Sequence, residues 1–258
     1  MRVLIIGSVA GGTSAAAKMR RNSEDLEIVI YDMDKDISYS GCGIPYFVGE
    51  DYISREDLTP RNSQWFKKRF NIDIFTEHKV TDIDFEKKLI SVINLKTGEA
   101  FTDSYDKLVI AVGANPSIPN IEGIDSANVF PVRNVQSGER IKIFIKEKNP
   151  KSAVIIGAGF IGLEMAENLK SRGLDVTLIE SAPHVMPSMD YEMALYIQDH
   201  LLKNGVKLYI SEKVGSITEN GRYVNTLSGS KIATDMIVVA TGVKPATDIV
   251  KNKGIKLG

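Results

Sequence analysis

One sequence pattern occurs twice in this chain and constrains its fold more than any other feature. The first copy begins at residue 2 and reads RVLIIGSVAGGTSAAAKMRR; the second begins at residue 153 and reads AVIIGAGFIGLEMAENLKSRG. Each copy starts with a short apolar run, passes through a cluster of glycines and then becomes rich in alanine. These features predict a buried parallel strand, a tight turn and a helix, in that order.

Each copy is followed by a second apolar strand that ends in an acidic residue. EIVIYD ends at Asp32, 25 residues after Gly7, and DVTLIE ends at Glu180, 23 residues after Gly157. This spacing is typical of a dinucleotide-binding βαβ unit. The glycines let the backbone approach a pyrophosphate, the helix N-terminus offers N–H groups, and the acid accepts hydrogen bonds from ribose hydroxyls. Ordinary strand–turn–helix units with incidental glycines are the alternative, and Val9 makes it more relevant to the first copy, because it replaces a glycine.

The rest of the chain supports a tandem architecture. LVIAVGANP (108–116) and IVVATGVKP (237–245) are each an apolar strand followed by Gly and then Pro. Between the first acid and the first of these strands, DIFTEHKVTDIDF, LISVINL and AFTDSY, with the turn KTGE, predict antiparallel strands. We therefore predict an α/β fold with two Rossmann-like dinucleotide-binding domains in tandem and antiparallel β insertions.

The predicted boundaries place the first domain at residues 1–116, with a return segment at 243–258, and the second at 117–242. The whole chain has 258 residues, a formal net charge of −1 and one cysteine. This charge does not indicate a nucleic-acid partner, and no apolar run reaches the roughly 20 residues that span a bilayer. A single cysteine cannot form an intrachain disulfide, so we expect a cytoplasmic protein. From the charge and the short apolar runs, we expect no membrane or nucleic-acid partner.

The cysteine, Cys42, lies in the segment SYSGCGIPYF (38–47). A lone cysteine is usually an inert core residue, but here two glycines flank it and Pro45 predicts the first turn of a helix. A thiolate at a helix N-terminus is stabilised, which favours a nucleophile. Two dinucleotide sites favour a resident flavin and a visiting nicotinamide, between which hydride passes. Because Cys42 lies only ten residues after Asp32, its thiol could reach the flavin.

The chain resembles a known family through its motifs. It is similar to the N-terminal part of the FAD-dependent pyridine nucleotide–disulfide oxidoreductases with a single redox cysteine, and most like coenzyme A disulfide reductases and NADH oxidases. The segments that carry the resemblance are VAGG (9–12), ISYSGCGIPY (37–46), LTP (58–60), YDKLVIAVGANP (105–116), VRN (132–134), GAGFIGLE (157–164) and ATGVKP (240–245).

The resemblance implies FAD in the first domain, NADH (or NADPH) in the second, and Cys42 as the catalytic residue. Phe160 matches a residue that covers the flavin until nicotinamide displaces it, and Glu180 would repel a 2′-phosphate and so favour NADH. Coenzyme A would contact Arg20, Arg21 and Ser38, although the two arginines also fit a solvated helix end. No metal site is predicted. The cofactor-binding residues would be Gly7, Val9, Ala10, Gly11, Gly12, Asp32, Ser38, Val80, Ala111, Gly113, Arg133, Gly157, Gly159, Phe160, Ile161, Gly162, Glu164, Glu180 and Gly242.

Position 10 separates the possible substrates. NADH peroxidases and water-forming NADH oxidases usually have histidine there, whereas this chain has Ala10, and its three histidines lie elsewhere. We therefore favour a disulfide or persulfide substrate, with coenzyme A disulfide first, although Gly41 stands where many coenzyme A disulfide reductases have asparagine. An NADH oxidase or peroxidase is the first alternative. The second is a non-catalytic redox-sensing or nucleotide-binding module, because the family's C-terminal dimerisation domain is expected to be absent, although a full-length enzyme would be a homodimer.

Overall fold

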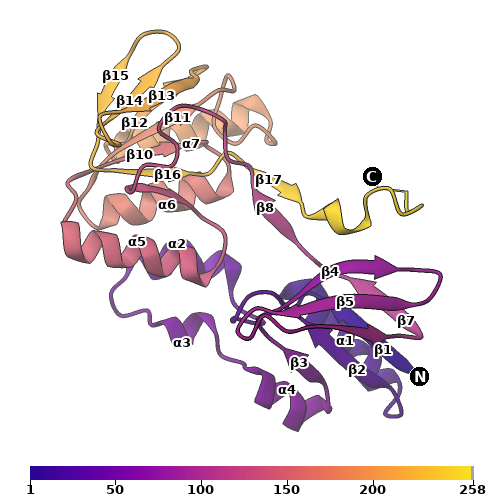
Figure 1. Ribbon diagram of the computed structural model, residues 1–258. Coiled ribbons are helices and arrows are strands. Elements are labelled where there is room, and N and C mark those ends of the chain that lie inside the picture. Colours follow the sequence, from indigo (N-terminus) through magenta and orange to yellow (C-terminus); the bar gives the residue numbers. More distant parts are fainter. Residues whose placement is uncertain (257–258) are drawn as a thin grey trace. The chain divides into compact units, whose positions relative to one another are not determined.

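The computed structural model describes residues 1–256, so the last two residues of the predicted return segment lie outside the described residues. The chain divides into two units, each built from separate stretches of sequence (Figure 1). Unit 1 contains Met1–Ser40, Thr59–Asn115 and the stretch from Pro245 onward; unit 2 contains Gly41–Leu58 and Pro116–Lys244.

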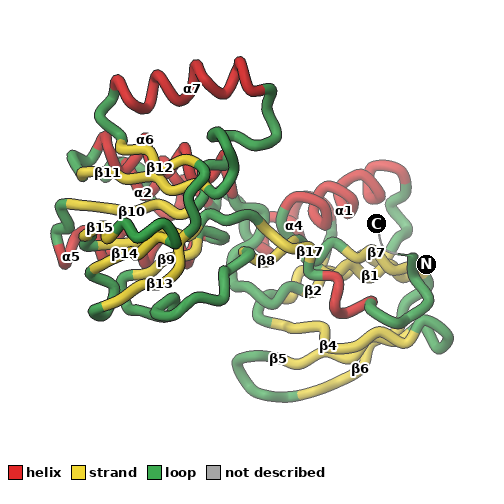
Figure 2. Tube along the Cα trace, turned by 90° about the horizontal axis from the view of Figure 1, so that it is seen from above, coloured by secondary structure: helices red, strands yellow, loops and turns green. Residues whose placement is uncertain are grey.

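Unit 1 is built around a four-stranded parallel sheet in the order β3-β2-β1-β7. Its strands are β1 (Arg2–Ile6), β2 (Glu27–Tyr31), β3 (Asp73–Phe75) and β7 (Lys107–Ile110). Helices α1 (Ala10–Asn22) and α4 (Ser63–Phe70) cover one face, and the antiparallel sheet of β4 (His78–Asp84), β5 (Leu89–Asn94) and β6 (Ala100–Ser104) covers the other (Figure 2). Burial on both faces explains why the central strands are continuously apolar.

The two cores of unit 1 use alternate residues of the same strand. Leu4 packs with Val80 and Ile90 of the antiparallel sheet, whereas Ile5 packs with Ala16 of α1 and Phe66 of α4. This alternation follows from the period of two in a β-strand.

The segment DIFTEHKVTDIDF differs from the prediction. It forms two strands, because the chain turns at Thr76–Glu77, where Glu77 has φ +56°. Its first part, β3, pairs in parallel with β2, and only β4 joins the antiparallel sheet. The predicted hairpin between β5 and β6 is confirmed.

Unit 2 repeats the design with a five-stranded parallel sheet in the order β12-β11-β10-β16-β9. Within Pro116–Lys244, three helices and a small antiparallel sheet of β13, β14 and β15 accompany this sheet. The strands are β9 (Val129–Pro131), β10 (Ser152–Ile156), β11 (Asp175–Glu180), β12 (Lys207–Ile210), β13 (Val214–Thr218), β14 (Tyr223–Thr226), β15 (Lys231–Ala233) and β16 (Met236–Val239), and the helices are α5 (Val135–Lys148), α6 (Phe160–Ser171) and α7 (Tyr191–Lys203).

The segment that carries the cysteine packs with unit 2, although the sequence-based division placed residues 41–58 in the first domain. It contains the 3₁₀ turn η1 (Gly41–Gly43) and the helices α2 (Ile44–Gly49) and α3 (Arg55–Leu58). Helix α2 packs against α5 and α6 (Figure 1). Gly138 of α5 makes this possible, since a Cβ there would lie only 3.0 Å from the Ile44 side chain.

Two of the four boundaries between the units fall within the short strands β8 (Ala114–Pro116) and β17 (Val243–Pro245), which pair with each other. After β17, the 3₁₀ turn η2 (Thr247–Val250) places Val250 in the core of unit 1. Among the described residues, no helix is both long and apolar enough to cross a bilayer.

Candidate functional site

The first glycine of each repeat adopts the same unusual backbone conformation. Gly7 has φ +100° and Gly157 has φ +103°, a region that side chains rarely adopt. A Cβ at Gly7 would lie 2.2 Å from the carbonyl oxygen of Ala111, and one at Gly157 would lie 2.4 Å from that of Ala240. Both positions therefore require glycine, and each turn lies directly against the neighbouring strand end.

The last glycine of each motif lets the helix start close to that turn. A Cβ at Gly12 would lie 1.8 Å from the Gly7 carbonyl oxygen, and one at Gly162 would lie 2.0 Å from the Gly157 carbonyl oxygen. Neither α1 nor α6 has a side-chain N-cap or an acid in its first turn, whereas asparagines cap α4 and α5. The first N–H groups of α1 and α6 are thus left for a ligand, as phosphate binding requires.

The two predicted acids occupy equivalent places. The Asp32 carboxylate accepts hydrogen bonds from the backbone N–H and the hydroxyl of Ser8, both at 2.6 Å. The Glu180 carboxylate accepts them from the backbone N–H of Ala158 at 2.7 Å and of Ala182 at 2.8 Å. Each acid therefore fastens its own glycine loop. Asp32 also accepts from the Asp34 N–H at 2.8 Å, and Glu180 from the Ser181 hydroxyl at 3.3 Å. A carboxylate has about four acceptor positions, so each acid keeps about one for a ribose hydroxyl.

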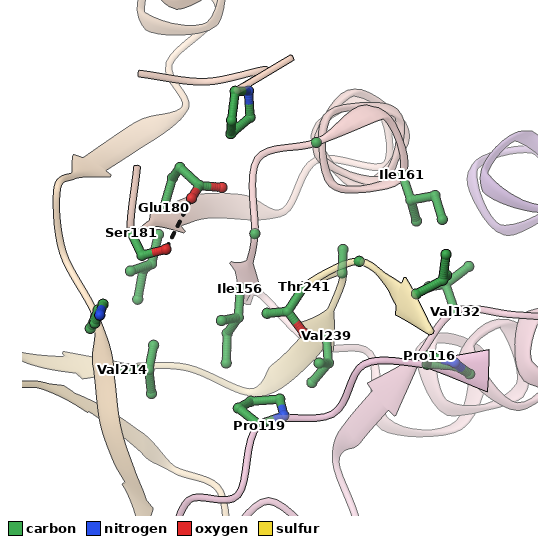
Figure 3. A pocket seen from close by; sticks show the side chains of 18 of the residues that line it. Pro116, Pro119, Val132, Ile156, Ile161, Glu180, Ser181, Val214, Val239 and Thr241 are labelled. Atoms are coloured by element: carbon green, nitrogen blue, oxygen red, sulfur yellow. Dashed lines mark hydrogen bonds between the residues drawn. The ribbon is translucent and has the colours of Figure 1, made fainter. Parts of the chain in front are cut away.

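In unit 2 these features open into a cavity of about 590 Å³. Figure 3 shows Glu180 and Ser181 on one side of it, and Ile161, Val132 and Pro116 on the other. The predicted residues Gly157, Gly159, Phe160, Ile161, Glu180 and Gly242 all line it. Phe160 lies at the cavity and is 68% exposed. Two predicted residues, Arg133 and Glu164, do not line the cavity. Arg133 lies just before α5. Glu164 lies on α6, where burial and then the charge of Glu167 raise the pKa of its carboxyl group.

In unit 1 the structure gathers most of the remaining predicted residues around the first loop. Gly11 faces Ala111, since a Cβ placed at Gly11 would lie 3.5 Å from the Ala111 Cβ. The Ser38 N–H donates to the Ser8 carbonyl oxygen at 2.9 Å. Val9 occupies the N-cap position of α1 without a side-chain hydrogen bond, Ala10 begins the helix, and Gly113 has φ +68° with open space around it. Val80 differs, because its side chain is buried in the core and only its backbone could meet a ligand.

Cys42 lies in the η1 turn immediately before α2, and its side chain is exposed. The predicted position of Pro45 in the first turn of α2 is confirmed. A small exposed thiol between two glycines is accessible to a bulky disulfide substrate.

Arg20 does not fit the predicted substrate-binding role. It is buried, and its guanidinium donates to the carbonyl oxygens of Phe70 (2.7 Å), Leu26 (2.6 Å), Asn71 (3.0 Å) and Glu24. Its donors are used to join α1 to the end of α4. The fixed fork of the guanidinium suits this structural role and leaves little capacity for a ligand.

Arg21 and Ser38, by contrast, line a second cavity in unit 1, of about 270 Å³. Arg61 and Trp65, which the sequence reasoning did not select, also line it. The Arg61 guanidinium lies over the Trp65 ring, 4.9 Å from its centroid. The sequence feature that could have indicated Arg61 and Trp65 is the basic and aromatic run RNSQWFKKRF (61–70). The same run is equally typical of an ordinary amphipathic helix.

The comparisons with known proteins agree with this geometry. Residues 1–258 match the family described as pyridine nucleotide-disulphide oxidoreductase, and the chain belongs to that family. It is 40% identical to an NADH oxidase of Methanocaldococcus jannaschii, over 100% of this chain and 58% of that protein. It is 35% identical to the coenzyme A disulfide reductase of Staphylococcus haemolyticus, over 99% of this chain and 57% of that protein.

Two solved structures show the same fold. The reduced CoADR-RHD of Bacillus anthracis superposes with a TM-score of 0.97 at 42% identity, over 100% of this chain and 46% of that one. An NAD-dependent persulfide reductase from A. fulgidus superposes with a TM-score of 0.95 at 37% sequence identity, over 100% of this chain and 49% of that one. The chain thus spans about half the length of these relatives. The predicted family and α/β fold class are confirmed; members of this family are enzymes that use FAD and NAD(P)H.

Proposed function

We propose that this chain provides the two nucleotide-binding units and the redox cysteine of an FAD-dependent NAD(P)H oxidoreductase. Its substrate is a low-molecular-weight disulfide or persulfide, with coenzyme A disulfide favoured. The observation that carries the proposal is the repeated glycine loop, uncapped helix and anchored acid, present once in each unit. Two dinucleotide sites and one exposed thiol match a reaction that passes two electrons from a nicotinamide to a disulfide.

Unit 2 suits the nicotinamide nucleotide. Its cavity is mostly apolar, and Glu180 lies on one side where ribose hydroxyls would bind. The carboxylate would repel a 2′-phosphate, so NADH is the preferred donor. Phe160 would cover the far part of the site until the nicotinamide enters.

Unit 1 suits FAD. The space at Gly7 and Gly12 is closed to any side chain, and α1 begins without a cap, so the backbone can approach a pyrophosphate closely. Asp32 would hold the adenosine ribose. When bound, FAD supplies the route by which two electrons from NADH reach a disulfide at Cys42.

The second cavity of unit 1 supports the substrate assignment. Arg21 and Arg61 present guanidinium groups suited to phosphates, and Trp65, one face of which the Arg61 guanidinium covers, is an aromatic ring of the kind that stacks with adenine. A coenzyme A thiol carries both chemical groups, whereas a simple alkyl disulfide carries neither.

The thiol chemistry balances as two steps. The Cys42 thiolate attacks one sulfur of coenzyme A disulfide; a Cys42–coenzyme A disulfide forms, and one coenzyme A thiolate leaves. Two electrons from one NADH then break the new disulfide, which releases the second coenzyme A thiolate and regenerates the Cys42 thiolate. One NADH and one proton are consumed for every two coenzyme A thiols produced.

An absorbance spectrum of the FAD-loaded protein tests this proposal. We expect flavin bands that bleach on anaerobic NADH addition, and a long-wavelength charge-transfer band between flavin and thiolate that is lost in Cys42→Ser. The same variant should keep NADH-dependent bleaching but lose coenzyme A disulfide reduction. A protein that cannot be loaded with FAD, or a Cys42→Ser variant that still reduces the disulfide, would contradict the proposal.

An NADH oxidase is the second candidate, because a 40% identical relative carries that name. Ala10 argues against it, since this first residue of α1 has no side chain that could assist oxygen or peroxide chemistry. Rapid oxygen consumption with NADH, in the absence of any disulfide, would favour this candidate.

The location and the assembly are further parts of the proposal. A single cysteine suits a reducing cytoplasm, where no structural disulfide is needed. The homodimer expected of a full-length relative is testable by the mass of the protein in solution.

A further inference from the structure

Two cations hold the end of the short helix that follows Cys42. The last carbonyl groups of a helix have no partner within it, and α2 has only six residues. The Arg172 guanidinium donates to the carbonyl oxygens of Val48 and Gly49, both at 3.1 Å. The Lys142 ammonium donates to the carbonyl oxygens of Glu50, the C-cap residue of α2, and of Ile53 in the loop that follows, both at 2.8 Å.

These contacts come from two different supporting helices. Lys142 lies on α5, and Arg172 is the C-cap of α6. The Arg172 side chain is only 17% exposed and also pairs with Asp51 at 2.9 Å. Partial burial lowers the pKa of Lys142, whose ammonium lies 4.3 Å from the centroid of the Phe47 ring. Both cations are therefore ordered by several contacts, unlike a typical surface lysine or arginine.

The backbone of α2 is also pressed directly onto α6. A Cβ at Gly49 would lie 2.2 Å from Oδ1 of Asn168, so the helix end approaches α6 as closely as glycine allows. Ile44, Phe47 and Val48 are buried, and the Ile44 and Phe47 side chains lie against Gly138 of α5. An isolated helix of this length is unstable in water, so its position depends on these partners.

We propose that Arg172 and Lys142 are positioning residues for Cys42. The thiol lies in a turn between two glycines, so the place where α2 is anchored sets where the sulfur lies. The two cations fix the C-terminal end of α2 to α5 and α6, and Pro45 stiffens the start of the helix. The redox role of Cys42 rests on the proposed function, whereas the anchoring itself does not.

The test compares Arg172→Met, Lys142→Met, the double variant and the conservative Arg172→Lys. Lys170→Met is the matched control, because Lys170 lies two residues away on α6 and pairs only loosely with Asp175 at 3.9 Å. Hydrogen exchange by mass spectrometry follows the amides of residues 41–54 and, as an internal reference, those of α7. The FAD-loaded proteins are compared by the amplitude of the flavin–thiolate absorbance band and by NADH affinity.

We expect exchange in residues 41–54 to rise about tenfold or more in the double variant, with α7 unchanged. The charge-transfer band should fall by more than half, while the dissociation constant for NADH changes less than about twofold. Arg172→Lys should recover much of the band, and Lys170→Met should resemble the wild type.

Unchanged exchange in residues 41–54 would overturn the anchoring. Faster exchange in residues 41–54 together with a fully retained flavin–thiolate band would overturn the positioning role. If the wild-type protein shows no such band, the redox role of Cys42 in the proposed function fails and the positioning role fails with it; the exchange data still decide the anchoring.

Discussion

The two units share one backbone frame and differ in the side chains that their glycine loops present. In both, a glycine with φ near +100° turns against a strand end, a second glycine admits the helix, and an acid binds the loop N–H. Where unit 2 has Gly159 and then the exposed Phe160, unit 1 has Val9 and Ala10. The glycine leaves more room at the backbone, and the phenyl ring adds a movable cover.

This difference suits a cofactor that stays and a cofactor that exchanges. Around Gly159 there is open space, since no atom of the described residues lies within 4 Å of the place that a Cβ would take. Unit 1 instead has a valine at the matching position. Under the proposed assignment, one backbone design would serve a resident FAD and an exchanging NADH through two neighbouring side chains.

The largest expected effect separates the two acids. Asp32→Asn should weaken FAD binding, and Glu180→Gln should weaken NADH binding, each by about 10- to 150-fold, because each variant loses charge-assisted hydrogen bonds. Retained FAD, measured by flavin absorbance, and NADH titration of each variant check the separation. If either variant weakened both nucleotides equally, the two sites would not be independent.

The next effect concerns the loop position where unit 2 has Gly159 and unit 1 has Val9. Gly159→Val should weaken NADH binding by about 5- to 150-fold, because its side chain would occupy the space of the pyrophosphate rather than clash with the protein. The melting temperature should stay within about 2 °C of the wild type. Val9→Gly is the counterpart in unit 1 and should leave FAD binding nearly unchanged. A large FAD loss in Val9→Gly would show that the valine is itself part of the flavin site.

A smaller effect compares two neighbouring arginines in unit 1. Arg20→Met should lower the free energy of unfolding by about 1–3 kcal/mol, because it leaves buried carbonyl groups without donors. Arg21→Met should change that free energy by less than about 0.5 kcal/mol but raise KM for coenzyme A disulfide about tenfold. Denaturant unfolding and steady-state kinetics distinguish them. The reverse pattern would restore the substrate role predicted for Arg20.

The smallest effect concerns acid stability in unit 2. Burial acts to raise the pKa of Asp235, but hydrogen bonds from the N–H groups of Lys151 and Ser152 and from the Ser152 hydroxyl outweigh it, so the pKa is lowered. A lowered pKa in the folded state means that the stabilisation is present above about pH 4 and is lost as the pH falls below it. In Asp235→Asn, the melting temperature should fall less steeply between pH 5 and pH 3. An unchanged slope would exclude this contribution.

Features encoded within a short stretch of sequence were predictable. The strands, glycines and acid of each repeat lie within about 30 residues, so spacing alone indicated both βαβ units. The role of Arg20 was not predictable, because two of its acceptors, Phe70 and Asn71, lie 50 and 51 residues away. The cavity that joins Arg21 to Arg61 depends on the same long-range packing. The grouping of residues 41–58 with unit 2 depends on side chains more than 80 residues later.

The anchoring of α2 also has a consequence for how the protein is made. The acceptor at Val48 and its donor Arg172 are separated by 124 residues, and Lys142 follows Glu50 by 92. At a synthesis rate of about 5–20 residues per second, Val48 is added to the chain roughly 6–25 seconds before Arg172. During that interval the apolar side chains of α2 lack part of the surface that buries them in the folded protein, because α6 is not yet complete. The α2 segment is therefore exposed to chaperones while the rest of unit 2 is synthesised.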